Sequence, residues 1–408
     1  SGAHRGRQMK LAARVGRVEP FYVMECAKAA REIAHGPLCD PARGGRPMIY
    51  LNIGEPDFTA TPPVKAAAAR ALADGSTQYT PATGLPELRT AISRWYGERF
   101  GLDIAPGRIV VTAGGSAALQ LACLALVGDG DEVLMPDPTY PCNRHFVAAA
   151  DGVPVMLPCG PGDRFQLQPQ AVEAAWSPRT RGLLLASPSN PTGTSIAPEA
   201  LEQLIATARA RSGFAIVDEI YLGLSDDERY GQSALAFDGP DGCVVSVNSF
   251  SKYFCMTGWR LGWLVLPESL VEPVERLAQN LFICASTLAQ RAALAAFDAD
   301  SIAECERRRA EFKARREFIV PALEGLGLKV PVAPDGAFYA WMDVSAHSDD
   351  SWDFAFHLMR EAQVALTPGR DFARVDSKRF LRLSCARSMG ELREAVDRIG
   401  RVLHAQRG

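Results

Sequence analysis

Seven short apolar runs, many of them separated by segments of helical length, constrain the fold of this 408-residue chain more than any other feature. The runs are RIVVTA, DEVLMP, VPVMLP, GLLLAS, FAIVDE, CVVSVN and LGWLVL. Each is continuously apolar and does not alternate with polar residues, which is typical of strands buried on both faces. Because such strands need helices on both sides, we predict an α/β fold whose large domain has a mostly parallel seven-stranded sheet between helices.

The pattern changes after about residue 285. A long charged helix is expected over 301–326, and strands and helices then follow without a regular alternation, which favours an α+β domain. A chain of this length also exceeds what one simple core supports. We therefore predict a smaller α+β domain built from the N-terminal segment and the C-terminal part. The expected divisions are an N-terminal arm and helix that pack with the small domain (1–48), a large ligand-binding domain (49–285) and a small C-terminal domain (286–408).

Composition argues against several functional classes. The chain has 44 Lys and Arg against 47 Asp and Glu, a formal charge of −3, which favours neither nucleic acid nor an anionic membrane as a partner. No apolar run approaches the roughly 20 residues that span a bilayer, and the basic start lacks the apolar core of a secretory signal. The 10 Cys and 6 His are scattered without metal-ligand spacing, so we expect no metal and reduced thiols in the cytoplasm.

Chemically unusual residues follow several of the predicted strands, where open α/β sheets bind their ligands. Gly115 and Ser116 stand at a strand-to-helix turn, whose free backbone N–H groups favour an anion such as phosphate. Asn190 lies in the rigid turn SPSNPTG, and Asp218 ends a buried strand with Tyr221 close behind. Each feature alone is also compatible with a purely structural turn or helix cap. A carboxylate at the end of a buried strand, however, is costly unless it meets a cation.

The stretch SFSKYFCMTGWRLGW, which begins at Ser249, adds a lysine to this set. Lys252 follows the hydroxyls of Ser249 and Ser251 and precedes Arg260. A lysine that is screened from water near other cations has a lowered pKa and becomes a nucleophile toward aldehydes. Pyridoxal phosphate combines an aldehyde, a phosphate and a basic ring nitrogen, so it is the cofactor that these residues predict. Lys252 would form the imine, and Asp218 would keep the ring nitrogen protonated.

The chain resembles the class I and II pyridoxal phosphate-dependent aminotransferases of fold-type I, which are like aspartate aminotransferase. An ordered set of motifs along nearly the whole chain carries the resemblance: LNIGEPDF, YTPATGLPELR, GGSAALQLACLAL, GDEVLMPDPTYP, SNPTG, VDEIY, SFSKYFCMTGWRLG and FLRLS. The lysine-containing motif is highly specific. The resemblance implies a transaminase that moves an amino group between a 2-amino acid and a 2-oxo acid.

The resemblance also implies a role for each matching residue that faces the cofactor. Lys252 is the Schiff-base lysine and proton shuttle, and Asp218 pairs with the pyridinium nitrogen. Tyr221 and Asn190 bond the ring hydroxyl, and Tyr140 stacks on the ring face. The groups that hold the phosphate are the N–H groups of Gly115 and Ser116 with Ser249, Ser251 and Arg260.

Two further implications concern the substrate and the assembly. Arg382 binds the substrate α-carboxylate with its two-pronged guanidinium, helped by Asn190 and Gly54. Tyr79 reaches the phosphate held by the neighbouring subunit, so we expect a homodimer.

The chain departs from the family pattern at two positions. Cys255 replaces a smaller residue, which we expect packing to accommodate, and Ser116 stands where some aspartate-specific relatives have a lysine. The segment 282–287, which relatives bring to the partner's substrate side chain, contains no Lys or Arg. With Phe21 and Tyr22 also near that side chain in relatives, we expect neutral aliphatic or aromatic donors, with 2-oxoglutarate or pyruvate as acceptor.

Three alternatives stay open at this point. A pyridoxal phosphate lyase or synthase, such as a carbon–sulfur β-lyase, shares nearly every site residue. An aspartate aminotransferase would need a cation near the substrate side chain, for which Arg291 is a candidate. A transcription regulator with an aminotransferase-like sensor domain would need a basic DNA-binding module before the fold, and the residues ahead of IYLNIGEPDF read instead as an arm and a helix.

Overall fold

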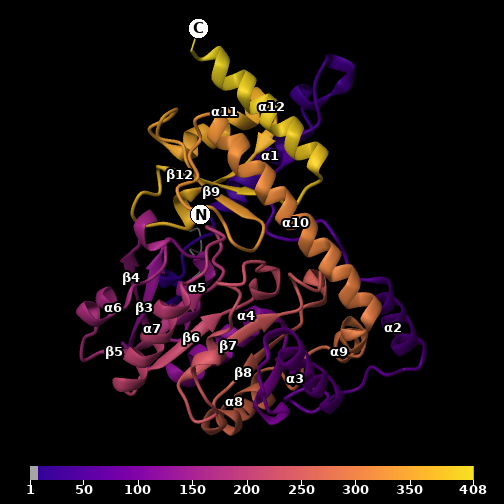
Figure 1. Cartoon of the computed structure of the whole chain (residues 1–408), viewed down its shortest axis with the longest axis vertical. Helices are drawn as coiled ribbons and strands as arrows, with labels where there is room; N and C mark the ends of the chain where they lie inside the picture. The colour runs from indigo at the N-terminus through magenta and orange to yellow at the C-terminus, as the bar shows by residue number, and fades with distance from the viewer. Residues whose placement is uncertain (1–7, 408) are drawn as a thin grey trace, which may run out of the picture.

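The computed structural model describes residues 8–407, so residues 1–7 of the predicted N-terminal arm and residue 408 lie outside the described part. Its large sheet contains β2 (Ile109–Thr112), β3 (Glu132–Asp137), β4 (Val153–Pro158), β5 (Thr180–Ala186), β6 (Phe214–Asp218), β7 (Val244–Ser249) and β8 (Gly262–Val265). The strand order is β2-β8-β7-β6-β5-β3-β4. β8 runs antiparallel to both neighbours, and the remaining adjacent pairs are parallel. The predicted seven-stranded, mostly parallel sheet is therefore confirmed (Figure 1).

Burial on both faces of the sheet explains the continuous apolar runs. Along β6, Ala215 and Val217 pack into one core cluster, whereas Ile216 between them packs into another. The helices that contribute to the first cluster include α3 (Pro86–Phe100), α6 (Pro169–Ala175), α7 (Pro198–Ala210) and α9 (Thr287–Leu294). Those that contribute to the second are α4 (Gly114–Leu126), α5 (Pro141–Ala149) and α8 (Glu268–Leu281). Because both faces are covered, a polar residue at any position of such a strand would be buried, and the strands are therefore apolar throughout.

A smaller α+β part combines the N-terminal segment with the C-terminal third of the chain. Its three-stranded antiparallel sheet has the order β11 (Thr367–Pro368), β12 (Phe380–Ser384), β9 (Tyr339–Asp343), and β1 (Ile49–Tyr50) pairs in parallel with β10 (Val364–Ala365). The helices here are α1 (Val23–Ala34), α11 (Ser351–Ala362) and α12 (Met389–Ala405). Cys26 and Ala30 of α1 pack against Met359 of α11. The predicted construction of the smaller part is confirmed, whereas the boundaries at 48 and 285 stay a prediction.

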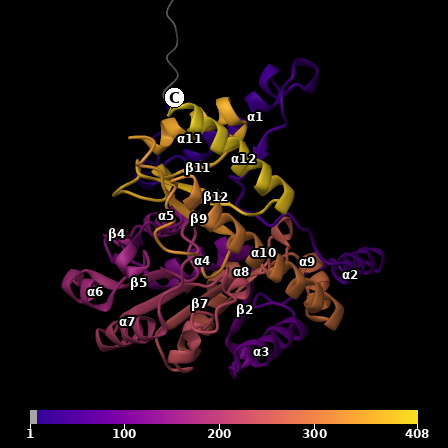
Figure 2. The same ribbon diagram turned by 45° about the horizontal axis from the view of Figure 1, so that its top comes forward.

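One long helix, α10 (Ala299–Gly325), joins the two parts. In both views it runs from beside α9 and α2 (Pro62–Ala73) toward α12 (Figures 1 and 2). Buried arginines tie it to neighbouring loops: Arg315 pairs with Asp57 at 2.8 Å, and Arg316 pairs with Asp226. Within the described chain, no helix has the length and apolarity needed to cross a bilayer.

Candidate active site

A cavity of about 630 Å³ lies at the carboxyl ends of the parallel strands. Every predicted site residue except Tyr79 lines it: Gly54, Gly115, Ser116, Tyr140, Asn190, Asp218, Tyr221, Ser249, Ser251, Lys252, Arg260 and Arg382. Tyr79 is 79% exposed and is not among the lining residues. The sheet explains part of this gathering, because β5, β6 and β7, which the residues from Asn190 to Lys252 end or follow, are adjacent in the sheet.

Lys252 stands on the turn that follows β7, in surroundings that favour its neutral form. Burial lowers the pKa of Lys252 to about 8, and the positive charges of Arg382 and Arg260 act in the same direction. Its Nζ donates a hydrogen bond to the Gly54 carbonyl oxygen at 2.5 Å and lies 5.4 Å from the centre of the Tyr221 ring. Cys255, on the same turn, is buried, with its Sγ 3.6 Å from the Lys252 carbonyl oxygen. A lysine in this state can act as a nucleophile or as a base near neutral pH.

Asp218, the last residue of β6, is a buried carboxylate held by neutral groups. It is 4% exposed and accepts hydrogen bonds from Asn143 Nδ2 at 3.3 Å and from the Ile220 backbone N–H at 3.2 Å. Burial raises the pKa of Asp218 to about 6. No Lys, Arg or His of residues 8–407 forms an ion pair with it, although the more distant charge of Lys252 acts to lower its pKa. A cationic group entering the cavity would compensate this buried charge.

The first turn of α4 and Arg260 form an anion-binding corner. Gly114 begins the helix with a φ of 85°, and a Cβ atom there would lie 2.7 Å from a guanidinium nitrogen of Arg260. Glycine therefore allows the guanidinium to lie against the helix N-terminus, where free N–H groups and the helix dipole favour negative charge. Ser249 and Ser251 add hydroxyls to the same cavity wall.

Arg382, on β12, brings a second guanidinium into the cavity from the smaller part of the molecule. It is 4% exposed, its Nη1 donates to Asn190 Oδ1 at 2.9 Å, and its Nη2 donates to the Asn52 carbonyl oxygen at 3.1 Å. In the described chain, Nε has no hydrogen-bond partner and all of these acceptors are neutral. A carboxylate is the ligand group that fits a buried guanidinium held in this way.

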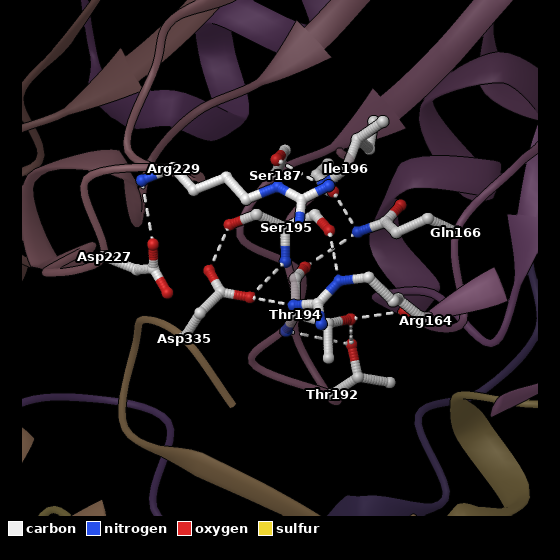
Figure 3. A network of polar contacts seen from close by, with 11 residues as sticks. Arg164, Gln166, Ser187, Thr192, Thr194, Ser195, Ile196, Asp227, Arg229 and Asp335 are labelled. Carbon is white, nitrogen blue, oxygen red and sulfur yellow. Dashed lines mark hydrogen bonds and ion pairs between the residues drawn. The ribbon is translucent and has the colours of Figure 1, made fainter. Parts of the chain in front are cut away.

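The loop that carries Asn190 is fixed by a polar network around Asp335, which Figure 3 shows facing Ser195 and Arg164. The Asp335 carboxylate accepts hydrogen bonds from the Ser195 N–H at 2.8 Å and from Arg164 Nη2 at 2.5 Å, and also from the Ser195 hydroxyl. The Asp335 N–H donates to the Gly193 carbonyl oxygen at 3.0 Å. The loop is therefore tied to the segment that leads into β9.

Comparison with known families shows which kind of protein has this arrangement. The family described as aminotransferase class I and II matches residues 46–399. The chain belongs to this family. A valine–pyruvate aminotransferase of Mycobacterium tuberculosis is 40% identical over 399 residues, which cover 97% of this chain and 99% of that protein. The aspartate/prephenate aminotransferase of Thermus thermophilus is 37% identical over 364 residues, which cover 88% of this chain and 92% of that protein.

A solved structure gives the same answer for the fold. The crystal structure of an aminotransferase from Mycobacterium tuberculosis matches with a TM-score of 0.90 and 39% identity, covering 98% of this chain and 100% of that chain. The protein is therefore an aminotransferase.

Part of the wall of the aminotransferase cavity is apolar. Phe21 and Val23, at the start of the N-terminal helix, line it together with Phe372. Tyr22 does not line it, because its ring instead lies 3.9 Å from the Arg370 guanidinium. The cationic side chains that line the cavity in the described chain are Lys252, Arg260 and Arg382, and Arg291 is not among them.

Sequence reasoning missed two residues that the aminotransferase places at the site. Asn143 bonds Asp218, and the Tyr339 hydroxyl lies 2.6 Å from the Tyr221 hydroxyl. Tyr339 lies in AFYAWMDV, which predicted a strand, and nothing in that stretch indicates that its hydroxyl would meet Tyr221 behind the cavity wall. Asn143 follows the PTYP motif within one helical turn, which is the signal that could have suggested it.

Proposed function

We propose that this aminotransferase binds pyridoxal 5′-phosphate, with Lys252 bonded to its aldehyde carbon. The main support for this proposal is that the cavity holds three groups that suit the cofactor, one for each of its functional parts. The corner of Gly114 and Arg260 suits the phosphate, Asp218 without a cationic partner in the described chain suits the ring nitrogen, and Lys252 suits the aldehyde. When bound, the cofactor supplies an aldehyde that takes up an amino group and a ring that accepts the electron pair released at the substrate Cα.

The chain's own residues would divide the remaining work. Asp218 stabilises a proton on the ring nitrogen, Tyr221 and Asn190 bond the ring hydroxyl, and Tyr140 covers a ring face. Lys252, once released by the incoming amino acid, carries a proton between the substrate Cα and the cofactor C4′. A lowered pKa suits this task, because the amine must accept and return a proton near neutral pH. The phosphate ligands are Gly115, Ser116, Ser249, Ser251 and Arg260.

We propose neutral aliphatic or aromatic amino acids as donors. Arg382 would bind the α-carboxylate, with Gly54 and Asn190 beside it, and the three cations of the cavity wall would then all have tasks. A second carboxylate on the substrate side chain would face Phe21 and Val23. The name of the valine–pyruvate relative supports a neutral donor with pyruvate as acceptor, and 2-oxoglutarate is the other acceptor that we propose.

A panel of amino donors tests this preference. Valine, leucine, phenylalanine and aspartate are compared by kcat/KM with pyruvate and with 2-oxoglutarate, and alanine and glutamate are each paired with the acceptor that is not their own 2-oxo acid. We expect a neutral donor to exceed aspartate by at least tenfold, or about 1.4 kcal/mol of transition-state preference. An aspartate value tenfold above every neutral donor would contradict the proposal and would indicate a further cation at the side-chain pocket.

We also propose a homodimer in which Tyr79 serves the partner's site. The exposed position of Tyr79 outside the cavity of its own chain supports this assignment. A cytoplasmic location is part of the proposal, supported by ten cysteines that are all free thiols. The division into 1–48, 49–285 and 286–408 is proposed with it.

A further inference from the structure

Tyr339 begins β9 and meets Tyr221 inside the molecule. The two hydroxyls are 2.6 Å apart, although the residues are separated by 118 positions in the chain. Tyr339 is fully buried, and Tyr221 is 3% exposed. Burial raises the pKa of both phenols, so both keep their hydrogen at neutral pH.

Hydrogen counting fixes the direction of this contact once a ligand is bound. A phenol has one hydrogen to donate. If Tyr221 donates its hydrogen to an oxygen of the ligand, it has none left for Tyr339, and the 2.6 Å contact then requires Tyr339 to be the donor. A phenol that accepts a hydrogen bond becomes a better donor, because bonds in such a chain polarise one another.

The ring of Tyr339 makes a second contact with the site. The Arg382 guanidinium carbon lies 4.4 Å from the centre of the Tyr339 ring, within the range of a cation–π interaction. The Tyr339 hydroxyl also lies 3.4 Å from where a Cβ atom on Gly54 would be. One side chain thus contacts both Tyr221 and Arg382, which carry separate tasks in the proposed function.

We propose that Tyr339 is a positioning residue with two separable actions. Its hydroxyl donates to Tyr221, which strengthens the hydrogen bond from Tyr221 to the cofactor's ring hydroxyl. Its ring supports the Arg382 guanidinium in the orientation that binds the substrate α-carboxylate. Both actions rest on the proposed binding of pyridoxal 5′-phosphate in this cavity.

The hydroxyl is tested by the pH titration of the visible spectrum of protein loaded with pyridoxal 5′-phosphate. Tyr339→Phe keeps the ring and removes the donor. A weaker bond from Tyr221 leaves more negative charge on the ring oxygen, which then holds the proton on the nitrogen of Lys252 more tightly. The pKa read from the change in the visible spectrum, called the spectral pKa here, should therefore rise by roughly half a unit. In a Tyr221→Phe background, Tyr339→Phe should add nothing, because its effect passes through Tyr221.

Tyr96→Phe is the matched control. Tyr96 is also fully buried, and its hydroxyl accepts a hydrogen bond from Trp263 Nε1 at 3.0 Å, outside the cavity-lining residues. Its loss should lower Tm without moving the spectral pKa. An unchanged pKa in Tyr339→Phe, or an equal shift in the Tyr221→Phe background, would overturn the hydroxyl's role. A wild-type protein without a visible band would instead count against the proposed cofactor itself.

The ring is tested by comparing Tyr339→Phe with Tyr339→Leu. Phenylalanine keeps the support under Arg382, and leucine removes it. We expect Tyr339→Leu to raise KM for the amino acid at least fivefold above that of Tyr339→Phe, with the dissociation constant for pyridoxal 5′-phosphate, measured on the apoprotein, within about twofold. Equal KM values in the two variants would overturn the role of the ring, as would a loss confined to cofactor binding.

Discussion

The surroundings of Lys252 lower the pKa of its amine well below the ordinary value for lysine. With a pKa of about 8, roughly one lysine in ten is neutral at pH 7. At the ordinary value of 10.5 the fraction would be about one in three thousand. Burial and two nearby guanidinium groups therefore raise the neutral population of Lys252 at pH 7 by roughly two to three orders of magnitude.

This tuning predicts the pH dependence of cofactor loading. Apoprotein is mixed with pyridoxal 5′-phosphate across a pH series, and the growth of visible absorbance is followed. Because the neutral amine is the nucleophile, the rate should rise about tenfold per pH unit below pH 8 and level off above it. Lys252→Ala should give no such band, which provides the control. A rate that continues to rise tenfold per unit up to pH 10 would mean that the lysine is not perturbed.

At the residue scale, the sequence was informative where one residue type is chemically unusual in its setting. Lys252 among apolar residues, Asp218 at the end of a buried run and Arg382 in LRLS all line the same cavity. Tyr339 escaped prediction because its contact with Tyr221 joins β9 of the small sheet to the segment after β6, and only the folded chain brings the two together. Likewise, no local pattern shows that a side chain at position 114 would clash with the Arg260 guanidinium.

Among the structural elements, the loop over 187–196 is held by a residue that is distant in the chain. Asp335 precedes β9, yet it bonds the Ser195 N–H and Arg164. The loop in turn places Asn190 Oδ1 2.9 Å from Arg382 Nη1. The orientation of the proposed carboxylate-binding group therefore depends on a carboxylate that does not line the cavity.

Replacing the Asp335 carboxylate should weaken binding of the amino acid substrate. For Asp335→Ala we expect an increase in KM for the amino acid of about tenfold, since roughly one hydrogen bond to a charged group loses its orientation. Asp350→Ala is the control, because it removes the α11 cap bond to the Trp352 N–H at 2.9 Å and should cost about 1 kcal/mol of stability without changing KM. Equal KM changes in both variants would show that the effect is general destabilisation.

The predicted bounds of helices and strands agree closely with the observed ones where the sequence pattern is long. The helix expected over 301–326 is α10 (Ala299–Gly325), and the run FAIVDE contains β6 (Phe214–Asp218). The two-residue strands β1, β10 and β11 were not predicted, because pairing with a partner rather than a local pattern creates them. β1 joins the start of the predicted large domain to a strand of the C-terminal part, which no analysis of periodicity could show.

Considered as a whole molecule, the proposed enzyme needs two chains for each site. Tyr79→Phe impairs the partner's site, and Lys252→Ala inactivates its own. In a random mixture half of the dimers are mixed, and each has one intact site, so activity should recover to about one quarter of the wild-type value. Recovery should be absent when the variants are mixed without subunit exchange. Activity equal to the sum of the separate variants after full exchange would contradict the shared site.

The proposed function depends on Lys252 holding pyridoxal 5′-phosphate and releasing it to an amino acid. Borohydride makes the bond between a lysine and the bound aldehyde permanent, and mass spectrometry of the peptides then locates it. We predict the adduct on Lys252 in the loaded protein. Adding excess valine alone, before borohydride, should largely prevent the adduct, because transamination leaves the cofactor in its amine form. An adduct on another residue, or an undiminished adduct on Lys252 after valine and every other amino donor, would contradict the account.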